Sequence, residues 1–144
     1  MKLISNIYQL YEDVGKEILQ ANSDKLKIVC EKHVNQLTGC FTVTLEIIVI
    51  SKILHDDDYG IVFSTNAQKE SHNGISNNQF ISGLYLTSDL SLGDGQIIDG
   101  IEELDYSPSN EENNSQIWDA ILNFTLSKIR DVKKILTDKN NIYT

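Results

Sequence analysis

The run FTVTLEIIVISKIL, residues 41–54, constrains the fold more than any other stretch of the chain. In its first half, apolar residues alternate with Thr42, Thr44 and Glu46, which is the period of a strand with one buried face. Over residues 47–50 both faces become apolar, as in a strand that is covered on both sides. The β-branched residues of this run also favour a pleated strand over a helix. We therefore predict a central strand.

Two elements are predicted before the central strand. Residues 3–20 carry apolar side chains at helical spacing and predict an amphipathic helix. Gly15 lowers the helix propensity by about 1 kcal/mol relative to alanine, and we interpret it as a close approach to the sheet. The stretch 25–31 alternates between charged and apolar residues and predicts a first strand. Residues 35–39 provide a turn, so this strand and the central one form an antiparallel hairpin.

Further strands are predicted after the central one. Residues 61–65 and 80–87 have strand character, with Gly83 as a candidate bulge. The polar stretch 66–79 between them is predicted to be a loop. Residues 96–104 fit a fifth strand, but their apolar spacing also fits a helix, and the sequence leaves both alternatives open.

The last long element is a helix over residues 116–137, which carry a continuous apolar stripe and a basic C-terminal half. Its candidate N-terminal caps are Asn113, Asn114 and Ser115. Residues 140–144 are expected to fray. We therefore predict one α+β domain over residues 1–144, with a mainly antiparallel sheet of four to five strands and the N-terminal and C-terminal helices packed on one face.

The reactive side chains form no recognisable catalytic or metal site. Cys30 and Cys40 lie on either side of the predicted turn, so a bridge across the hairpin and two reduced thiols are both open, the second being favoured. The run HDDDYG lacks the alternating acids of a calcium loop. Phosphate loops and nucleophile elbows are absent from the sequence. We expect no metal, no cofactor and no enzymatic activity.

The chain also lacks the sequence signals of a membrane or secreted protein. Its longest uninterrupted apolar run, residues 47–50, is far too short to cross a bilayer. The N-terminal MKLIS is followed by polar and acidic residues, unlike a signal peptide. We therefore expect a cytoplasmic protein.

Charge is the most informative property of the sequence. The formal net charge at pH 7 is −9. Residues 1–54 contain six Lys and six acids, which cancel, and residues 116–144 contain five basic residues and three Asp, which sum to +2. Residues 55–115 contain twelve acids and a single Lys, which sum to −11. With one Arg in the whole chain, nucleic-acid binding is not expected.

An acidic middle segment suggests a protein-binding role, provided that its turns meet on one surface. Such a surface speeds association with a basic partner. Our leading hypothesis is a non-enzymatic bacterial immunity protein that neutralises a basic toxin such as a nuclease. Acids with neighbouring aromatic residues are the candidate partner-binding residues: Asp56, Asp57, Asp58, Tyr59, Glu102, Glu103, Asp105 and Tyr106. The alternative is a structural or assembly subunit, of a phage type, that forms homo-oligomers through Ile47–Ile50.

Overall fold

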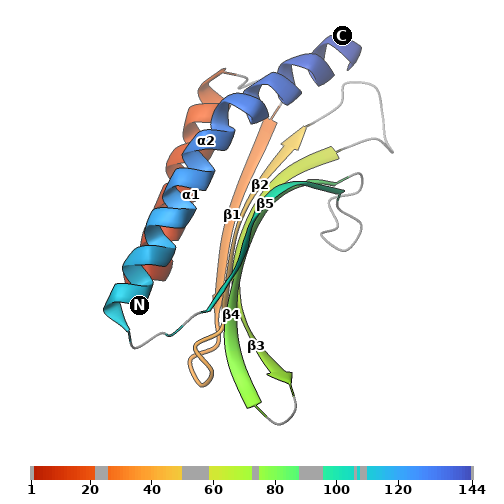
Figure 1. Ribbon diagram of the computed structural model, residues 1–144. Coiled ribbons are helices and arrows are strands. Elements are labelled where there is room, and N and C mark those ends of the chain that lie inside the picture. The colour runs from red at the N-terminus through yellow and green to blue at the C-terminus, as the bar shows by residue number, and fades with distance from the viewer. Residues whose placement is uncertain are drawn as a thin grey trace.

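The computed structural model describes residues 2–21, 26–49, 59–72, 75–87, 96–105, 107 and 110–143. Its elements in chain order are helix α1 (Lys2–Ala21), strands β1 (Leu26–Val34), β2 (Phe41–Val49), β3 (Tyr59–His72), β4 (Ile75–Thr87) and β5 (Gln96–Asp105), and helix α2 (Glu111–Tyr143). The five strands form one antiparallel sheet in chain order. Both helices lie on the same face of that sheet (Figure 1). The predicted α+β architecture is confirmed, and residues 96–104 are a strand.

The turn between β1 and β2 is closed by its own side chains. The Oδ1 atom of Asn35 accepts hydrogen bonds from the N–H groups of Leu37 at 3.0 Å and Thr38 at 3.3 Å. Gly39 has a φ of 75°, a conformation that residues with a side chain rarely adopt. Its N–H donates to the carbonyl oxygen of Asn35 at 2.9 Å. This local chemistry confirms the predicted hairpin.

The two cysteines do not face each other. Cys30 lies opposite Leu45, which follows Cys40 by five residues, so the thiols are separated by roughly 16 Å along the hairpin. That separation exceeds the reach of a disulfide, and both cysteines are free. The predicted alternative of a bridge across the hairpin is therefore wrong. Burial raises the pKa of the Cys30 thiol to about 11, so this thiol stays protonated at neutral pH.

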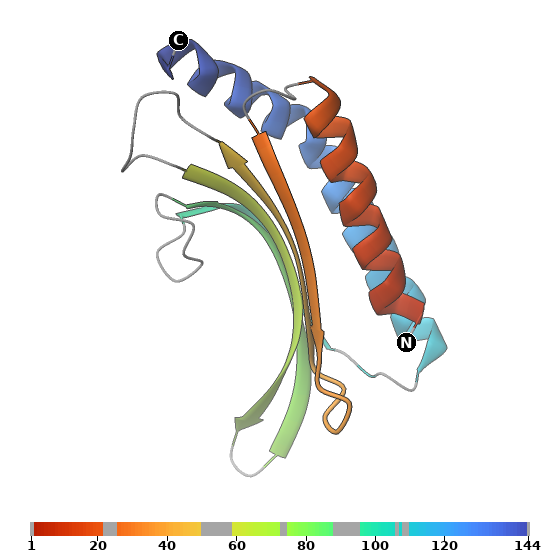
Figure 2. The same cartoon turned by 180° about the vertical axis from the view of Figure 1, so that it is seen from behind.

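Residues 66–79, predicted to be a loop, belong instead to a long hairpin of β3 and β4. The ladder runs without interruption from the pair Gly60–Thr87 to the pair His72–Ile75. Asn, Ser and Gln have low strand propensity, but here the backbone ladder continues from the apolar half of each strand and decides the conformation. The tip of this hairpin projects past the helices and past the β1–β2 turn (Figures 1 and 2). It therefore has no helix to pack against, which explains its polar sequence.

Helix α2 begins at Glu111, earlier than the predicted start at residue 116. Its N-terminus is capped by Asn110, whose Oδ1 accepts a hydrogen bond from the N–H of Asn113 at 3.1 Å. The predicted caps are therefore wrong, and they lie inside the helix. Glu111 and Glu112 occupy the first turn, where the helix dipole favours acids.

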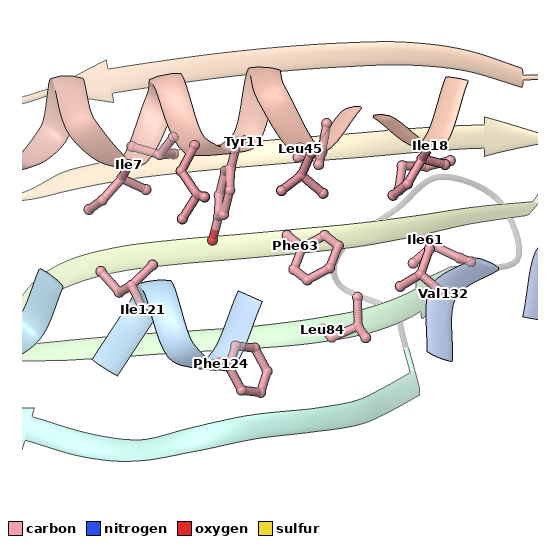
Figure 3. Packing of buried hydrophobic residues seen from close by; sticks show 14 of the residues in the cluster. Ile7, Tyr11, Ile18, Leu45, Ile61, Phe63, Leu84, Ile121, Phe124 and Val132 are labelled. Carbon is pink, nitrogen blue, oxygen red and sulfur yellow. The ribbon is translucent and has the colours of Figure 1, made fainter. Parts of the chain in front are cut away.

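The core lies between the helices and the convex face of the sheet. Figure 3 shows side chains from both helices and from three strands meeting there: Ile7, Tyr11, Ile18, Leu45, Ile61, Phe63, Leu84, Ile121, Phe124 and Val132. Gly15 lets α1 approach closely, because a Cβ at this position would lie 2.7 Å from Cγ2 of Ile28. The predicted role of Gly15 is thus confirmed. An ion pair of 3.0 Å between Lys133 and Glu17 joins the two helices.

One polar network lies within this apolar layer. The Tyr11 hydroxyl from α1 is hydrogen-bonded to Oγ1 of Thr65 in β3 at 2.5 Å (Figure 3 shows the tyrosine reaching toward that strand). Oγ1 of Thr65 is in turn 2.9 Å from Oγ of Ser82 in β4. Burial raises the pKa of Tyr11 to about 12, so the hydroxyl remains neutral. Three hydroxyl groups therefore satisfy one another inside the core.

Candidate functional site on the concave face

The five strands bend away from the helices, so the sheet is convex toward α1 and α2 and concave on its other face (Figures 1 and 2). No described helix or strand covers the concave face. Side chains alternate between the faces of a strand, so the neighbours of the core residues point to the concave side. They include Val29, Glu31, Thr42, Thr44, Glu46, Val62, Ser64, Asn66, Ile81 and Tyr85. This open surface is the candidate site.

A row of small residues crosses the sheet where it bends. Thr44 pairs with Ser64, Ser64 with Gly83, and Gly83 with Gly100. The pairing of β4 with β5 is irregular on both sides of Gly83, in agreement with the predicted bulge. A Cβ at Gly83 would lie 2.8 Å from the hydroxyl oxygen of Tyr85, whose ring folds back over the glycine. Glycines and bulges favour curvature of a sheet, so Gly83, Gly100 and the irregular β4–β5 pairing are consistent with the concavity.

Glu46 stands in the partly dehydrated part of this surface. Its neighbour Val62, on β3, is only 2% exposed, so the floor of the concave face at this point is shielded from water. Glu31 lies diagonally across from Glu46, since Glu31 pairs with Thr44 and Glu46 pairs with Val29. Burial, together with the Glu31 carboxylate, raises the pKa of Glu46. A half-buried carboxylate beside a like charge favours a cation supplied from outside.

Two basic side chains share this face of β1, and neither neutralises Glu46. Lys27 lies opposite Ile48 and is exposed. His33 is also exposed, and its Nε2 lies 3.8 Å from Oε2 of Glu31. Within the part of the chain that the structure describes, Glu46 forms no ion pair. Lys27 lies diagonally across from Glu46, as Glu31 does, but no described cation is within ion-pair distance of the Glu46 carboxylate.

Asn66 adds a second unsatisfied group to the same face. Its Oδ1 is buried and accepts no hydrogen bond, a situation that costs about 1–3 kcal/mol for a buried acceptor. Asn66 pairs with Thr42, whereas Glu46 pairs with Val62, so the two acceptors are offset by four residues, roughly 13 Å. Thr44 lies between them on β2. Oδ1 of Asn66 is thus a buried acceptor beneath this face, and the Glu46 carboxylate is the acceptor that a donor from a partner can reach.

The predicted partner-binding residues are only partly described. Asp56, Asp57, Asp58 and Tyr106 lie outside the described residues. The backbones of four others are placed, Tyr59 as the first residue of β3 and Glu102, Glu103 and Asp105 near the end of β5.

The ladder places the backbones of those two segments toward opposite ends of the sheet. Asp105 pairs with Gln79, and Gln79 pairs with Gln68. Gln68 follows Tyr59 by nine residues in β3, which corresponds to roughly 30 Å along a strand. A partner that contacts both segments must therefore span the length of the sheet.

Sequence reasoning missed Glu31, Glu46 and Asn66. The charge count directed attention to residues 55–115, whereas both glutamates lie in the segment whose charges cancel. A signal was nevertheless present in the alternation of Thr42, Thr44 and Glu46, which predicts that these side chains share the face away from the core. Only the bend of the sheet shows that this face is concave and partly dry.

A pocket of about 640 Å³ lies at the turn end of the β1–β2 hairpin, and it shares His33 and Thr42 with the concave face. Its lining combines apolar and neutral polar side chains with one imidazole and one thiol: His33, Val34, Asn35, Thr38, Cys40, Phe41, Thr42, Ala67 and Gln68. Leu37, at the neighbouring turn, is 98% exposed. No carboxylate is among these lining residues.

Comparisons with known proteins give no match, whether with family models, with curated proteins or with solved structures. Among the described residues, no three or more His, Cys, Asp or Glu side chains are grouped so as to hold a metal ion. Neither described helix is long and apolar enough to span a membrane. The geometry of the concave face is therefore the basis for a functional proposal.

Proposed function

We propose that this protein is a non-enzymatic binding protein that docks a basic protein on its concave face. The observation that carries the proposal is Glu46, a half-buried carboxylate with a raised pKa and no ion pair among the described residues. A Lys or Arg side chain from a partner supplies the missing positive charge and lowers the pKa of Glu46.

The most economical role of such a protein is that of a bacterial immunity protein. It covers the basic surface of a toxin, such as the nucleic-acid cleft of a nuclease, and so blocks the toxin's substrate. The net charge of −9 supports this role, because opposite net charges accelerate association. In this proposal, Asp56, Asp57 and Asp58, with Tyr59, and the group Glu102, Glu103, Asp105 and Tyr106 make peripheral contacts that guide the partner to the concave face.

The test uses the product of the adjacent gene, where that product is basic, as the purified partner. Glu46→Gln removes the charge and keeps the shape of the side chain. We expect the dissociation constant to rise about tenfold at pH 7, the loss of a partly desolvated ion pair. The matched control is Asp119→Asn, which makes the same charge change on an exposed residue of α2 and is expected to change affinity less than about twofold.

Two further measurements sharpen this test. Affinity is expected to fall as salt rises, because the interface is electrostatic. It is also expected to rise with pH through the raised pKa of Glu46, because the cation binds the ionised carboxylate. Equal effects of Glu46→Gln and Asp119→Asn would remove the concave face from the interface.

For the alternative function, a homo-oligomeric structural subunit, the sequence predicts Ile47–Ile50 as the interface. Ile47 is fully buried in the core beneath the helices, and Ile48 is half-buried on the concave face. Residue 50 lies outside the described residues. β2 is paired on both edges, with β1 and with β3. Assembly of this chain with itself therefore calls for a different surface.

A further inference from the structure

Among the described strands, only β2 pairs with β1, so the other edge of β1 has no described strand beside it. The N–H of Asn35 donates to the carbonyl oxygen of Cys40 at 2.8 Å. This bond shows which residues of β1 direct their backbone N–H and C=O groups toward β2. In an antiparallel pair, hydrogen-bonding residues alternate with residues whose N–H and C=O point outward. The outward-pointing residues of β1 are therefore Leu26, Ile28, Cys30, Lys32 and Val34. These five residues of the nine-residue strand direct their backbone N–H and C=O groups away from β2, where another strand can pair with them.

The side chains along this edge leave room for a second strand. Ile28 and Cys30 are half-buried and pack at the margin of the core. The Lys32 ammonium, which would otherwise guard the edge, lies 4.8 Å from the centre of the Tyr8 ring on α1. This contact holds the Lys32 ammonium over α1 and away from the edge of β1.

The sequence of β1 is self-complementary in one antiparallel register. A two-fold axis at Val29 places Lys27 opposite Glu31 of a second copy, and Glu31 opposite its Lys27. The same axis places Ile28 opposite Cys30, so that outward-pointing residues face each other and exchange hydrogen bonds. Both Lys27 and Glu31 are exposed in the single chain and available for this pairing.

The neighbouring registers are less favourable. An axis at Cys30 places Val29 opposite Glu31 and Lys27 opposite His33, which loses both ion pairs. An axis at Glu31 places that carboxylate opposite its own copy, and like charges directly opposite are destabilising. Charge thus selects the axis at Val29.

We propose that two copies of this chain pair antiparallel along β1 about a two-fold axis at Val29. The two sheets join into one of ten strands, and the concave faces become continuous. Ile28 of each chain is covered by Cys30 of the other. Each Glu31 is neutralised by Lys27 of the other copy, which leaves Glu46 as the uncompensated carboxylate of each concave face. The pairing does not depend on the proposed partner binding.

The first test reverses the charges. Lys27→Glu and Glu31→Lys each place like charges opposite one another at two symmetric positions, and each is expected to weaken dimerisation about tenfold. The double variant Lys27→Glu with Glu31→Lys restores opposite charges and is expected to recover the original dissociation constant. Lys16→Glu, an equal charge change on the exposed face of α1, is the control. The measurement is sedimentation equilibrium.

The second test fixes the register. In a background with Cys30→Ser and Cys40→Ser, Val29→Cys places two thiols at a non-hydrogen-bonded pair, where the Cα atoms are about 4.5 Å apart and can form a disulfide. We expect a covalent dimer upon mild oxidation. His33→Cys in the same background has no matching thiol and is expected to stay monomeric.

Three results would overturn the proposal: a monomer at every concentration, a dimer indifferent to Lys27→Glu, or crosslinking of Val29→Cys no faster than of His33→Cys. Each leaves the effect of Glu46→Gln on a basic partner unaffected, so failure of the pairing and failure of the docking proposal are distinguishable.

Discussion

Replacing Glu46 by glutamine is expected to stabilise the free protein while weakening its binding to a basic partner. In the single chain, the Glu46 carboxylate is half-buried and lies diagonally across from Glu31. A neutral amide of the same shape removes the repulsion and is less costly to dehydrate. Pairwise effects at such cross-strand positions are about 0.2–1 kcal/mol, and the exposure of the site keeps the gain within that range.

The pH dependence distinguishes charge from packing. The pKa of Glu46 is raised in the folded state, so the wild-type protein loses stability relative to the variant as pH rises from the unfolded value, about 4.3, through the raised folded value. Below about pH 4 the carboxyl is protonated in both states, and the two proteins are expected to have equal stability. The free energy of unfolding is measured in urea at pH 3.5 and pH 7, with Trp118 fluorescence as the probe.

Asp119→Asn accounts for the general benefit of removing one negative charge from a chain of net charge −9. Its stabilisation at pH 7 is expected to be the smaller of the two. The reasoning fails if Glu46→Gln destabilises the protein at pH 7, or if its gain is the same at both pH values. Either outcome would mean that the carboxylate is already well solvated or is paired within its own chain.

Three stability predictions concern the core, and urea unfolding measures each. Gly15→Ala gains about 1 kcal/mol of helix propensity but forces a methyl group against Ile28, an overpacking of about 1–3 kcal/mol, so a net loss is expected and a gain would contradict the close approach of α1. Tyr11→Phe removes the hydroxyl bonded to Thr65 and is expected to lose about 1 kcal/mol, whereas no loss would mean that the bond is energetically idle. Thr125→Val removes a buried hydroxyl without a hydrogen-bond partner and is expected to gain about 1 kcal/mol, with unchanged stability as the contrary result.

Periodicity predicted those elements whose conformation is decided by burial. The alternation around Thr42, Thr44 and Glu46 and the helical spacing of residues 3–20 both reflect a face that packs against the core, and both predictions are confirmed. Residues 66–79 show no such alternation although Ala67 lies in the core, because the tip of the β3–β4 hairpin extends beyond the helices (Figure 1). Its conformation depends on backbone pairing with a distant segment, which local patterns do not report.

The candidate site was less predictable than the fold, because a count of charges along the sequence does not report which carboxylates become buried. The acidic segment 55–115 holds most of the net charge, yet the described carboxylate with a raised pKa is Glu46, in a segment of zero net charge. Its environment depends on the shape of the whole sheet, including Gly83 and Gly100, which lie two and three strands away. The curvature of a sheet depends on the register of several strands together, so it cannot be predicted from the sequence of one strand.

The hydrogen-bonded hydroxyl groups of Tyr11, Thr65 and Ser82 specify the position of α1 along the sheet, which apolar contacts alone specify poorly. If α1 contacted the sheet only through aliphatic side chains, a shift of the helix by one turn, about 5.4 Å, would exchange one aliphatic side chain for another at little cost. The same shift would move the Tyr11 hydroxyl away from Thr65 and break the hydrogen-bond chain that links α1 through Thr65 to Ser82 on β4. The network therefore favours a single position of α1 on the sheet.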